Sequence, residues 1–286
     1  MKYLKAVTRR LRWTRPPTTQ YPETPYIATG GSPPSQLTPT QAMFVKWNAE
    51  RLHLSLEESR ARFLSSWTVF RDGLAGAEFR RFCMLSHRVF QVFVTDSEHE
   101  VIDAYRLHAP MHFLRMLSYP ESRWDEQDIV VQRLGGRARV DILDYGCGLA
   151  QHSRGLAQYL LGRGIPTHLY LVDIETLRKE FLLWLAKQLD VETTFIASTV
   201  PARPIPSLPP SDICFAQEFF EHVYDPVRYL DAIHSSLKPR GILVTNVSDH
   251  HSEFMHVSPR LSEVRARLNS LGYEEVRPQV VYQKRG

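Results

Sequence analysis

The feature that most constrains the fold is a repeated order of strand, turn and helix that begins near residue 125. Three short apolar stretches have the length of buried strands: VDILDY (140–145), HLYLVDI (168–174) and DICFAQE (212–218). The stretches between them, such as LAQHSRGLAQYLLGRG (149–164), have helical spacing. Apolar strands that alternate with helices are typical of a parallel sheet covered by helices on both faces. We therefore expect an α/β fold whose strands end at one common edge.

The turn after the first expected strand, ILDYGCGLAQHS, places Gly146 and Gly148 one residue apart. Glycine lets the backbone approach a ligand closely, and the helix that follows presents unsatisfied N–H groups at its start. The next strand ends near Asp173, an acid that can accept both hydroxyls of a ribose. A glycine turn and an acid on successive strands together predict a site for a nucleoside-containing cofactor.

The residues around the turn also discriminate between cofactors. A dinucleotide-binding turn has a third glycine, which this chain lacks; Ala150 stands two residues after Gly148. Asp144, two residues before the first glycine, would repel a phosphate and attract a cationic ligand. S-adenosylmethionine carries an ammonium and a sulfonium and no phosphate, so these residues favour it over NAD.

Three stretches, VDILDYGCGLAQHSRGLA, LYLVDI and DICFAQEFFEHVYDPVRYLDAIHSSLKPRGILVTNV, resemble the successive motifs of class I S-adenosylmethionine-dependent methyltransferases, in their small-molecule branch. The resemblance covers residues 125–286. It implies a Rossmann-like, mostly parallel seven-stranded sheet with helices on both faces. The chain departs from the family at Arg240, where the turn usually has a glycine. It also lacks the usual acid after the third strand, where Ser198 or Thr199 would contact the adenine.

The resemblance further implies which residues hold S-adenosylmethionine. Asp144 would face its methionine end, Asp173 its ribose and Ile174 its adenine. Cys147 is expected to contribute its backbone and to pack, rather than to act as a nucleophile. The expected cofactor-binding residues are Asp144, Tyr145, Gly146, Cys147, Gly148, Asp173, Ile174, Ser198, Thr199 and Gln217.

Such an enzyme moves a methyl group from a sulfonium to an oxygen, nitrogen, carbon or sulfur nucleophile, so it mainly supplies alignment and, for some acceptors, a base. Glu221 is one polar group at the expected edge. The catalytic candidates are Glu218, His222, His250, His251 and His256. The last three share the loop SDHHSEFMHVSP, for which substrate recognition, solvation and metal binding are open alternatives. Their spacing follows no standard metal pattern, so we assign no metal ligand.

The first 124 residues are organised differently. Residues 1–40 combine a tail with six Lys and Arg in its first fifteen positions and a Pro-rich arm. Residues 41–124 are rich in aromatic residues at helical spacing. Pro39 suits a first helical turn, and Ser55–Glu58 have capping-box spacing. We expect residues 41–124 to form a helical cap that encloses a small, partly apolar substrate, and 125–286 to form the methyltransferase domain.

We expect the function to be biosynthetic methylation of a small-molecule metabolite. The basic tail leaves nucleic-acid methylation open as an alternative, although the sheet region shows no basic groove. A cyclase or a non-catalytic binding protein on the same fold is another alternative. The three cysteines form no C-x-x-C pair, and no apolar run approaches the length of a membrane span. We therefore expect a cytoplasmic protein without membrane contact; its oligomeric state stays open, with a homodimer as one alternative.

Overall fold

The computed structural model describes residues 37–75, 124–198, 205–249, 256–258 and 260–286, with eight further residues between 102 and 117. The described residues all belong to one compact unit, Pro33–Gly286. The basic tail and most of the Pro-rich arm lie outside them, as do Thr199, His250 and His251.

The centre of the fold is a seven-stranded sheet with the order β3-β2-β1-β4-β5-β7-β6. Its strands are β1 (Val140–Tyr145), β2 (Thr167–Asp173), β3 (Glu192–Ala197), β4 (Ser211–Ala216), β5 (Leu237–Thr245), β6 (Glu274–Arg277) and β7 (Val281–Gln283). Strands β1 to β5 pair in parallel, and β7 runs antiparallel to both β5 and β6. The expected mostly parallel seven-stranded α/β sheet is confirmed.

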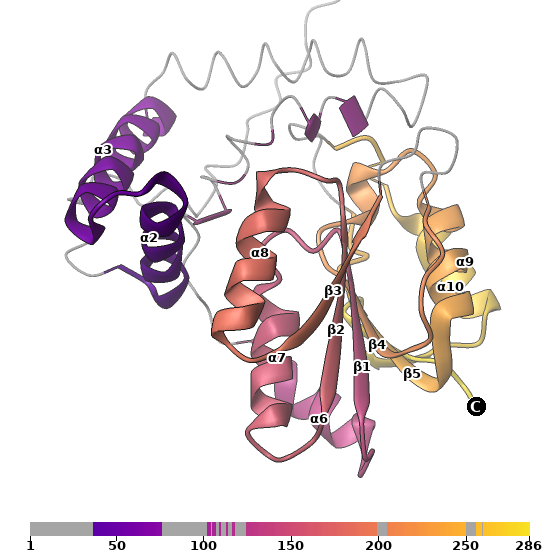
Figure 1. The fold of residues 1–286 in the computed structure, drawn as a ribbon. Helices are drawn as coiled ribbons and strands as arrows, with labels where there is room; N and C mark the ends of the chain where they lie inside the picture. Colours follow the sequence, from indigo (N-terminus) through magenta and orange to yellow (C-terminus); the bar gives the residue numbers. More distant parts are fainter. Residues whose placement is uncertain are drawn as a thin grey trace, which may run out of the picture. The chain divides into compact units, whose positions relative to one another are not determined.

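Helices cover the sheet on both faces, with α7 and α8 opposite α9 and α10 (Figure 1). The helices of this part are α6 (Gln127–Leu134), α7 (Gln151–Leu161), α8 (Leu177–Gln188), α9 (Pro226–Ser236) and α10 (Ser262–Ser270). Neighbouring residues of a strand point to opposite faces. Ile142 of β1 accordingly packs in one core with Leu156 of α7, and Leu143 packs in the other core with Leu230 of α9. None of the described helices has both the length and the apolar character needed to span a bilayer.

Strand β5 begins earlier than the sequence predicts. The family resemblance places a turn at Arg240, and this residue lies inside Leu237–Thr245. Arg240 there has a φ of 59°, the left-handed conformation that favours glycine. Next to it, a Cβ on Gly241 would lie 2.8 Å from the carbonyl oxygen of Lys238. The irregular backbone thus occurs within the strand, where it coincides with a register shift between β4 and β5.

Two further helices, α2 (Pro39–Leu52) and α3 (Leu56–Ala75), precede the sheet. Pro39 lies in the first turn of α2, and the Thr38 hydroxyl accepts a hydrogen bond from the Gln41 N–H at 3.2 Å. The hydroxyl of Ser55 likewise accepts from the N–H of Glu58 at 3.2 Å, while the Glu58 carboxylate accepts from the N–H of Ser55 at 2.9 Å. Both predicted helix starts are confirmed. They could be predicted from the sequence because a capping box depends on residues that are three positions apart.

Helix α2 packs against α8 through aromatic side chains. The rings of Phe44 and Trp47 lie 5.7 Å and 5.4 Å from that of Phe181, which is fully buried. At the edge of this contact, the Trp184 indole N–H donates to the Glu50 carboxylate at 2.7 Å. The expected helical segment thus shares a hydrophobic core with a helix of the sheet region.

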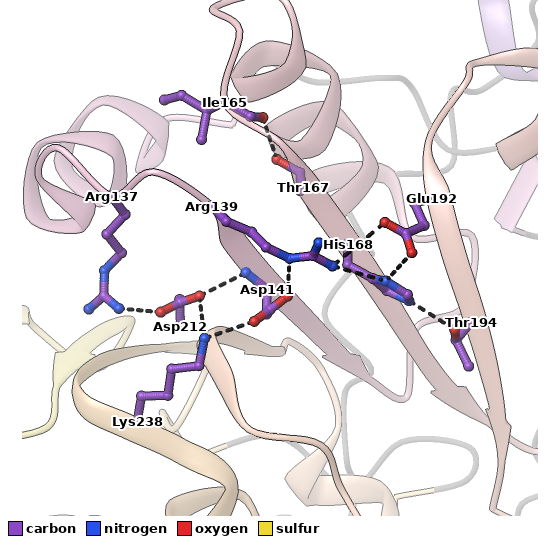
Figure 2. A network of polar contacts seen from close by, with 10 residues as sticks. All are labelled: Arg137, Arg139, Asp141, Ile165, Thr167, His168, Glu192, Thr194, Asp212 and Lys238. Atoms are coloured by element: carbon purple, nitrogen blue, oxygen red, sulfur yellow. Dashed lines mark hydrogen bonds and ion pairs between the residues drawn. The ribbon is translucent and has the colours of Figure 1, made fainter.

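A network of charged side chains joins the amino ends of three strands (Figure 2). Asp212 of β4 is 2% exposed, and its carboxylate accepts from the Lys238 ammonium at 2.9 Å and from the N–H of Asp141 at 2.8 Å. Arg137 also donates to Asp212, and Lys238 donates to the Asp141 carboxylate at 2.8 Å. The network lies at the edge opposite the strands' carboxyl ends, so it stabilises the sheet rather than building the ligand edge.

Candidate functional site

The turn between β1 and α7 contains three left-handed residues: Gly146, Gly148 and Ala150, with φ of 69°, 52° and 52°. A Cβ on Gly146 would lie 2.6 Å from Cδ2 of Phe219, and one on Gly148 would lie 3.3 Å from Sδ of Met116. Glycine is therefore required at position 146 by its conformation and by the ring of Phe219, in addition to any ligand. Ala150 takes this left-handed conformation with a side chain present, which costs about 1–2 kcal/mol.

Asp173 ends β2 and faces this turn. One carboxylate oxygen accepts from the N–H of Gly148 at 3.0 Å, and the other accepts from the N–H of Ile174 at 2.7 Å. Arg178, in the first turn of α8, donates to the second oxygen at 3.3 Å, and its side chain is 9% exposed. Sequence reasoning missed Arg178, because the face on which a helical side chain lies depends on how α8 is rotated against the sheet.

Asp144, near the end of β1, is a buried acid with a strongly shifted pKa. Its carboxylate accepts from the hydroxyl of Ser153 in α7. The pKa of Asp144 is raised to about 7: burial raises it most, the hydrogen bond from Ser153 lowers it, and the charge of Asp173 raises it. A cation bound beside Asp144 would reverse this shift.

Gln217 directly follows β4 and contacts the start of α7. Its side-chain oxygen lies within hydrogen-bond distance of Nδ1 of His152. The His152 ring in turn stacks on Trp124, with centroids 5.9 Å apart and planes 16° apart. The contact joins the carboxyl end of β4 to the helix that follows the glycine turn, and sequence reasoning did not identify His152.

The remaining expected cofactor residues surround the turn. Tyr145 is buried in the core with its ring 4.8 Å from that of Phe219, so its backbone is what borders the turn. The N–H of Ser198 donates to the carbonyl of Asp173 at 2.9 Å. Cys147 is buried, and burial together with the charges of Asp173 and Asp144 raises its pKa well above 9.0. A thiol held protonated in this way is a poor nucleophile, which agrees with its expected packing role.

Of the catalytic candidates, His222 and His256 lie together, and Glu221 lies with them. The rings of His222 and His256 are 4.8 Å apart and nearly perpendicular, at 78°. One nitrogen from each histidine and one oxygen of Glu221 all lie within 4.8 Å of one another. Glu221 and His222 belong to the short helix η1 (Phe220–His222), which follows β4. We refer to Glu221, His222 and His256 as the Glu–His–His cluster.

Glu218 contacts a residue that follows β5. Its side chain is exposed, its φ is 47°, and its carboxylate accepts from the side-chain amide of Asn246 at 2.7 Å. His250 and His251 lie outside the described residues, so their candidacy stays a prediction.

Residues from the segment between α3 and α6 approach both parts of the site. The ring of Tyr105 lies 5.8 Å from that of His222, and Sδ of Met116 lies 3.3 Å from Nη1 of Arg178. A cavity of about 340 Å³ lies beside Arg178, and its lining consists of Arg106, Ala109, Phe113, Glu175, Thr176, Leu177 and Arg178. This volume falls within the range of small-molecule pockets, about 300–1,000 Å³.

Comparison with known proteins agrees with this architecture. A family model described as a methyltransferase domain matches residues 137–281, half of the chain. A search of curated proteins finds no significant match.

Three solved structures illustrate the similarity. A protein of Listeria monocytogenes, described as a class I S-adenosylmethionine-dependent methyltransferase, is 14% identical with a TM-score of 0.46, covering 86% of this chain and 88% of that one. The [4+2]-cyclase SpnF is 19% identical with a TM-score of 0.44, covering 62% and 73%. A SAM-dependent methyltransferase from Aquifex aeolicus is 16% identical with a TM-score of 0.41, covering 55% and 87%. On the match of the family model, the chain belongs to the methyltransferase-domain family and is a class I S-adenosylmethionine-dependent methyltransferase.

Proposed function

We propose that this methyltransferase methylates a small, partly apolar metabolite that meets the Glu–His–His cluster beyond the carboxyl end of β4. The observation that carries the proposal is that two separate groups of polar residues lie at the carboxyl ends of the strands. Asp144 and Asp173 stand at the ends of β1 and β2, and the cluster follows β4. One group suits the cofactor, and the other is left for the acceptor.

The contacts between the two groups support this arrangement. Gln217 and Phe219 lie between β4 and the cluster in sequence, and they contact His152 and the glycine turn respectively. With the cofactor ribose at Asp173 and its ammonium at Asp144, the sulfonium would be directed toward Gln217. An acceptor held at the cluster would then approach the methyl group in line.

Enclosure of the acceptor is supported by the residues that approach from the N-terminal helical region. Tyr105 lies against His222, and Met116 lies against the glycine turn. An aromatic and a thioether side chain at the site suit an apolar acceptor more than the charged backbone of a nucleic acid. The expected cap over the substrate is therefore part of this proposal.

Transfer of a labelled methyl group tests the proposal. The protein is incubated with S-adenosylmethionine carrying a trideuterated methyl group and a cell extract, and the metabolite, nucleic-acid and protein fractions are analysed by mass spectrometry. We expect one or a few small metabolites to gain one labelled methyl group. Label found in nucleic acid or protein and in no metabolite would contradict the proposal, while label in no fraction with intact cofactor binding would favour a non-methylating role.

A further inference from the structure

We propose that the Glu–His–His cluster is a binding site for a divalent transition-metal ion of the Zn²⁺ or Fe²⁺ class. Two imidazoles and one carboxylate would be its protein ligands, and the remaining coordination positions would accept an oxygen of the methyl acceptor. The metal site stands on its own geometry, and the role of the acceptor rests on the proposed function.

The donor atoms are already close together. They all lie within 4.8 Å of one another, and the carboxylate oxygen of Glu221 is 3.8 Å from Nε2 of His222. Ligand atoms around one ion lie about 3–3.5 Å apart when the bonds are about 2.1 Å long. The remaining difference is small enough for side-chain rotation, so the backbone of η1 need not move.

The backbone holds the two contributing segments together. The carbonyl oxygen of Glu221 accepts from the N–H groups of Val257 at 2.7 Å and Ser258 at 2.9 Å. The hydroxyl of Ser258 donates to the carbonyl of Val223 at 2.8 Å. Residues 256–258 are thereby fixed to Glu221 and to Val223, the residue directly after η1. A site arranged in this way before the ion binds requires little additional ordering.

The ligand chemistry indicates the class of ion. Imidazole suits Zn²⁺, Fe²⁺ and neighbouring transition metals, whereas Mg²⁺ and Ca²⁺ prefer sites made of oxygen atoms. Two histidines and one carboxylate also occur in catalytic metal sites that keep positions open for water or substrate. Glu221 is fully buried and His256 is 7% exposed, so the low dielectric constant around them strengthens their attraction for a cation.

The positions of the three residues along the sequence do not reveal this site. The loop histidines alone follow no metal-binding pattern, and the pair Glu221–His222 is adjacent in the chain. Only the hydrogen bonds between η1 and residues 256–258 place His256 beside that pair. The proposal therefore goes beyond the sequence pattern, from which no metal ligand was assigned.

A metal at this position would select hydroxyl acceptors such as phenols or enols. Binding to the ion lowers the pKa of the hydroxyl, and its proton passes to solvent. The resulting oxygen anion attacks the methyl carbon of S-adenosylmethionine. A carbon–oxygen bond forms, the carbon–sulfur bond breaks, and the sulfur keeps the bonding electron pair, which gives the methyl ether and neutral S-adenosylhomocysteine.

Metal binding can be measured without any acceptor. Full-length protein is freed of metal with a chelator and titrated with Co²⁺, by visible absorption, and with Zn²⁺, by calorimetry. We expect one ion per chain. His222→Ala and His256→Ala should each weaken binding by more than about 100-fold, because even the outer partners of metal ligands contribute about 10–100-fold. His256→Gln repeats the test with a hydrogen-bonding side chain, and binding of S-adenosylhomocysteine shows that each variant is folded.

His168→Ala is the matched control, because His168 also lies beside a glutamate, with Nδ1 3.0 Å from Glu192, at the amino end of the sheet. This variant should bind the ion like the wild type. If the wild type does not bind, or if all the histidine variants bind equally, the metal site is wrong. Methylation of a metabolite that persists in chelator without bound metal would overturn the role of the metal in the reaction and leave the proposed function intact. Bound metal without methylation of any metabolite would support the metal site and contradict the proposed function.

Discussion

At the scale of single residues, Asp144 couples the protonation of the protein to the charge of its cofactor. Its pKa is raised to about 7, mainly by burial, so in the ligand-free protein much of this carboxyl is protonated at neutral pH. An acid whose pKa is higher in the folded than in the unfolded chain lowers stability as pH rises from 3.8 toward about 7, since the folded state binds the proton more tightly. A bound ammonium group compensates the ionised carboxylate.

We therefore predict that the affinity for S-adenosylmethionine decreases as the pH is lowered below about 7. The decrease should approach tenfold per pH unit, because binding must then release the proton of Asp144. Calorimetry between about pH 6 and 8 in buffers of different ionisation enthalpy measures both the affinity and the released proton. Asp144→Asn should bind more weakly and should lose this pH dependence. Wild-type affinity that is constant over this range would show that Asp144 does not meet the ammonium.

The site also shows which residues sequence can and cannot identify. Asp173 was predictable because it ends a strand that local periodicity reveals, and all parallel strands end at one edge. Arg178 and His152 were not, because their partners depend on how α8 and α7 are rotated against the sheet. The meeting of His222 with His256 depends on a contact between segments far apart in the chain.

At the scale of elements, the starts of helices and the central residues of strands could be predicted from the local sequence pattern, whereas the bounds of β5 could not. Thr38 and Gln41 are three residues apart, so their capping box is visible in the sequence. The start of β5 at Leu237 depends on pairing with Ser211 of β4. A proline and a charged residue in that stretch suggested a turn, and pairing across the sheet overrode this local preference.

The amino-edge network in Figure 2 provides a test of how β1, β4 and β5 are joined. Asp212→Asn should lower the free energy of unfolding by about 3 kcal/mol, because it leaves Arg137 without its buried counter-charge and Lys238 with Asp141 as its remaining carboxylate partner. Asp231→Asn is the control, since its pair with Arg267 at 2.8 Å is half exposed and should contribute less than about 1 kcal/mol. Urea unfolding measures both values. Equal effects of the two substitutions would mean that the network does not stabilise the sheet.

The same network has a defined pH dependence through Asp141. Burial alone would raise the pKa of Asp141, but hydrogen bonds and charges from Lys238 and Arg139 lower it below 3.8. An acid whose pKa is depressed by folding contributes stability above its unfolded pKa and loses that contribution as pH falls through its folded pKa. The contribution of Asp141 should therefore be complete at neutral pH and should decline progressively as pH falls through 3.8 toward the lower pKa of the folded state.

At the scale of the whole molecule, the helices before the sheet share their core with α8. Trp47→Ala should lower the free energy of unfolding by about 3–5 kcal/mol, because it opens a cavity against Phe181 and Phe113. Leu52→Ala, in the same helix but 43% exposed, should change it by less than about 0.5 kcal/mol. Thermal or urea unfolding distinguishes the two. If Trp47→Ala were as mild as the control, α2 would not belong to the folded core that supports the site.

The central claim is that the strand ends of β1 and β2 hold S-adenosylmethionine, and Asp173 tests it most directly. Calorimetry compares S-adenosylmethionine, S-adenosylhomocysteine and NAD on the wild type and on two variants. Glu180→Gln is the control, because it removes an acid of the following helix α8 that is exposed and paired with Arg51.

We predict micromolar binding of S-adenosylmethionine and its product, and no binding of NAD. Asp173→Ala should weaken the binding of both by at least about 100-fold, since it removes two charge-assisted hydrogen bonds to the ribose. Glu180→Gln should bind them like the wild type. Wild-type affinity in Asp173→Ala, or binding of NAD in place of S-adenosylmethionine, would contradict the account.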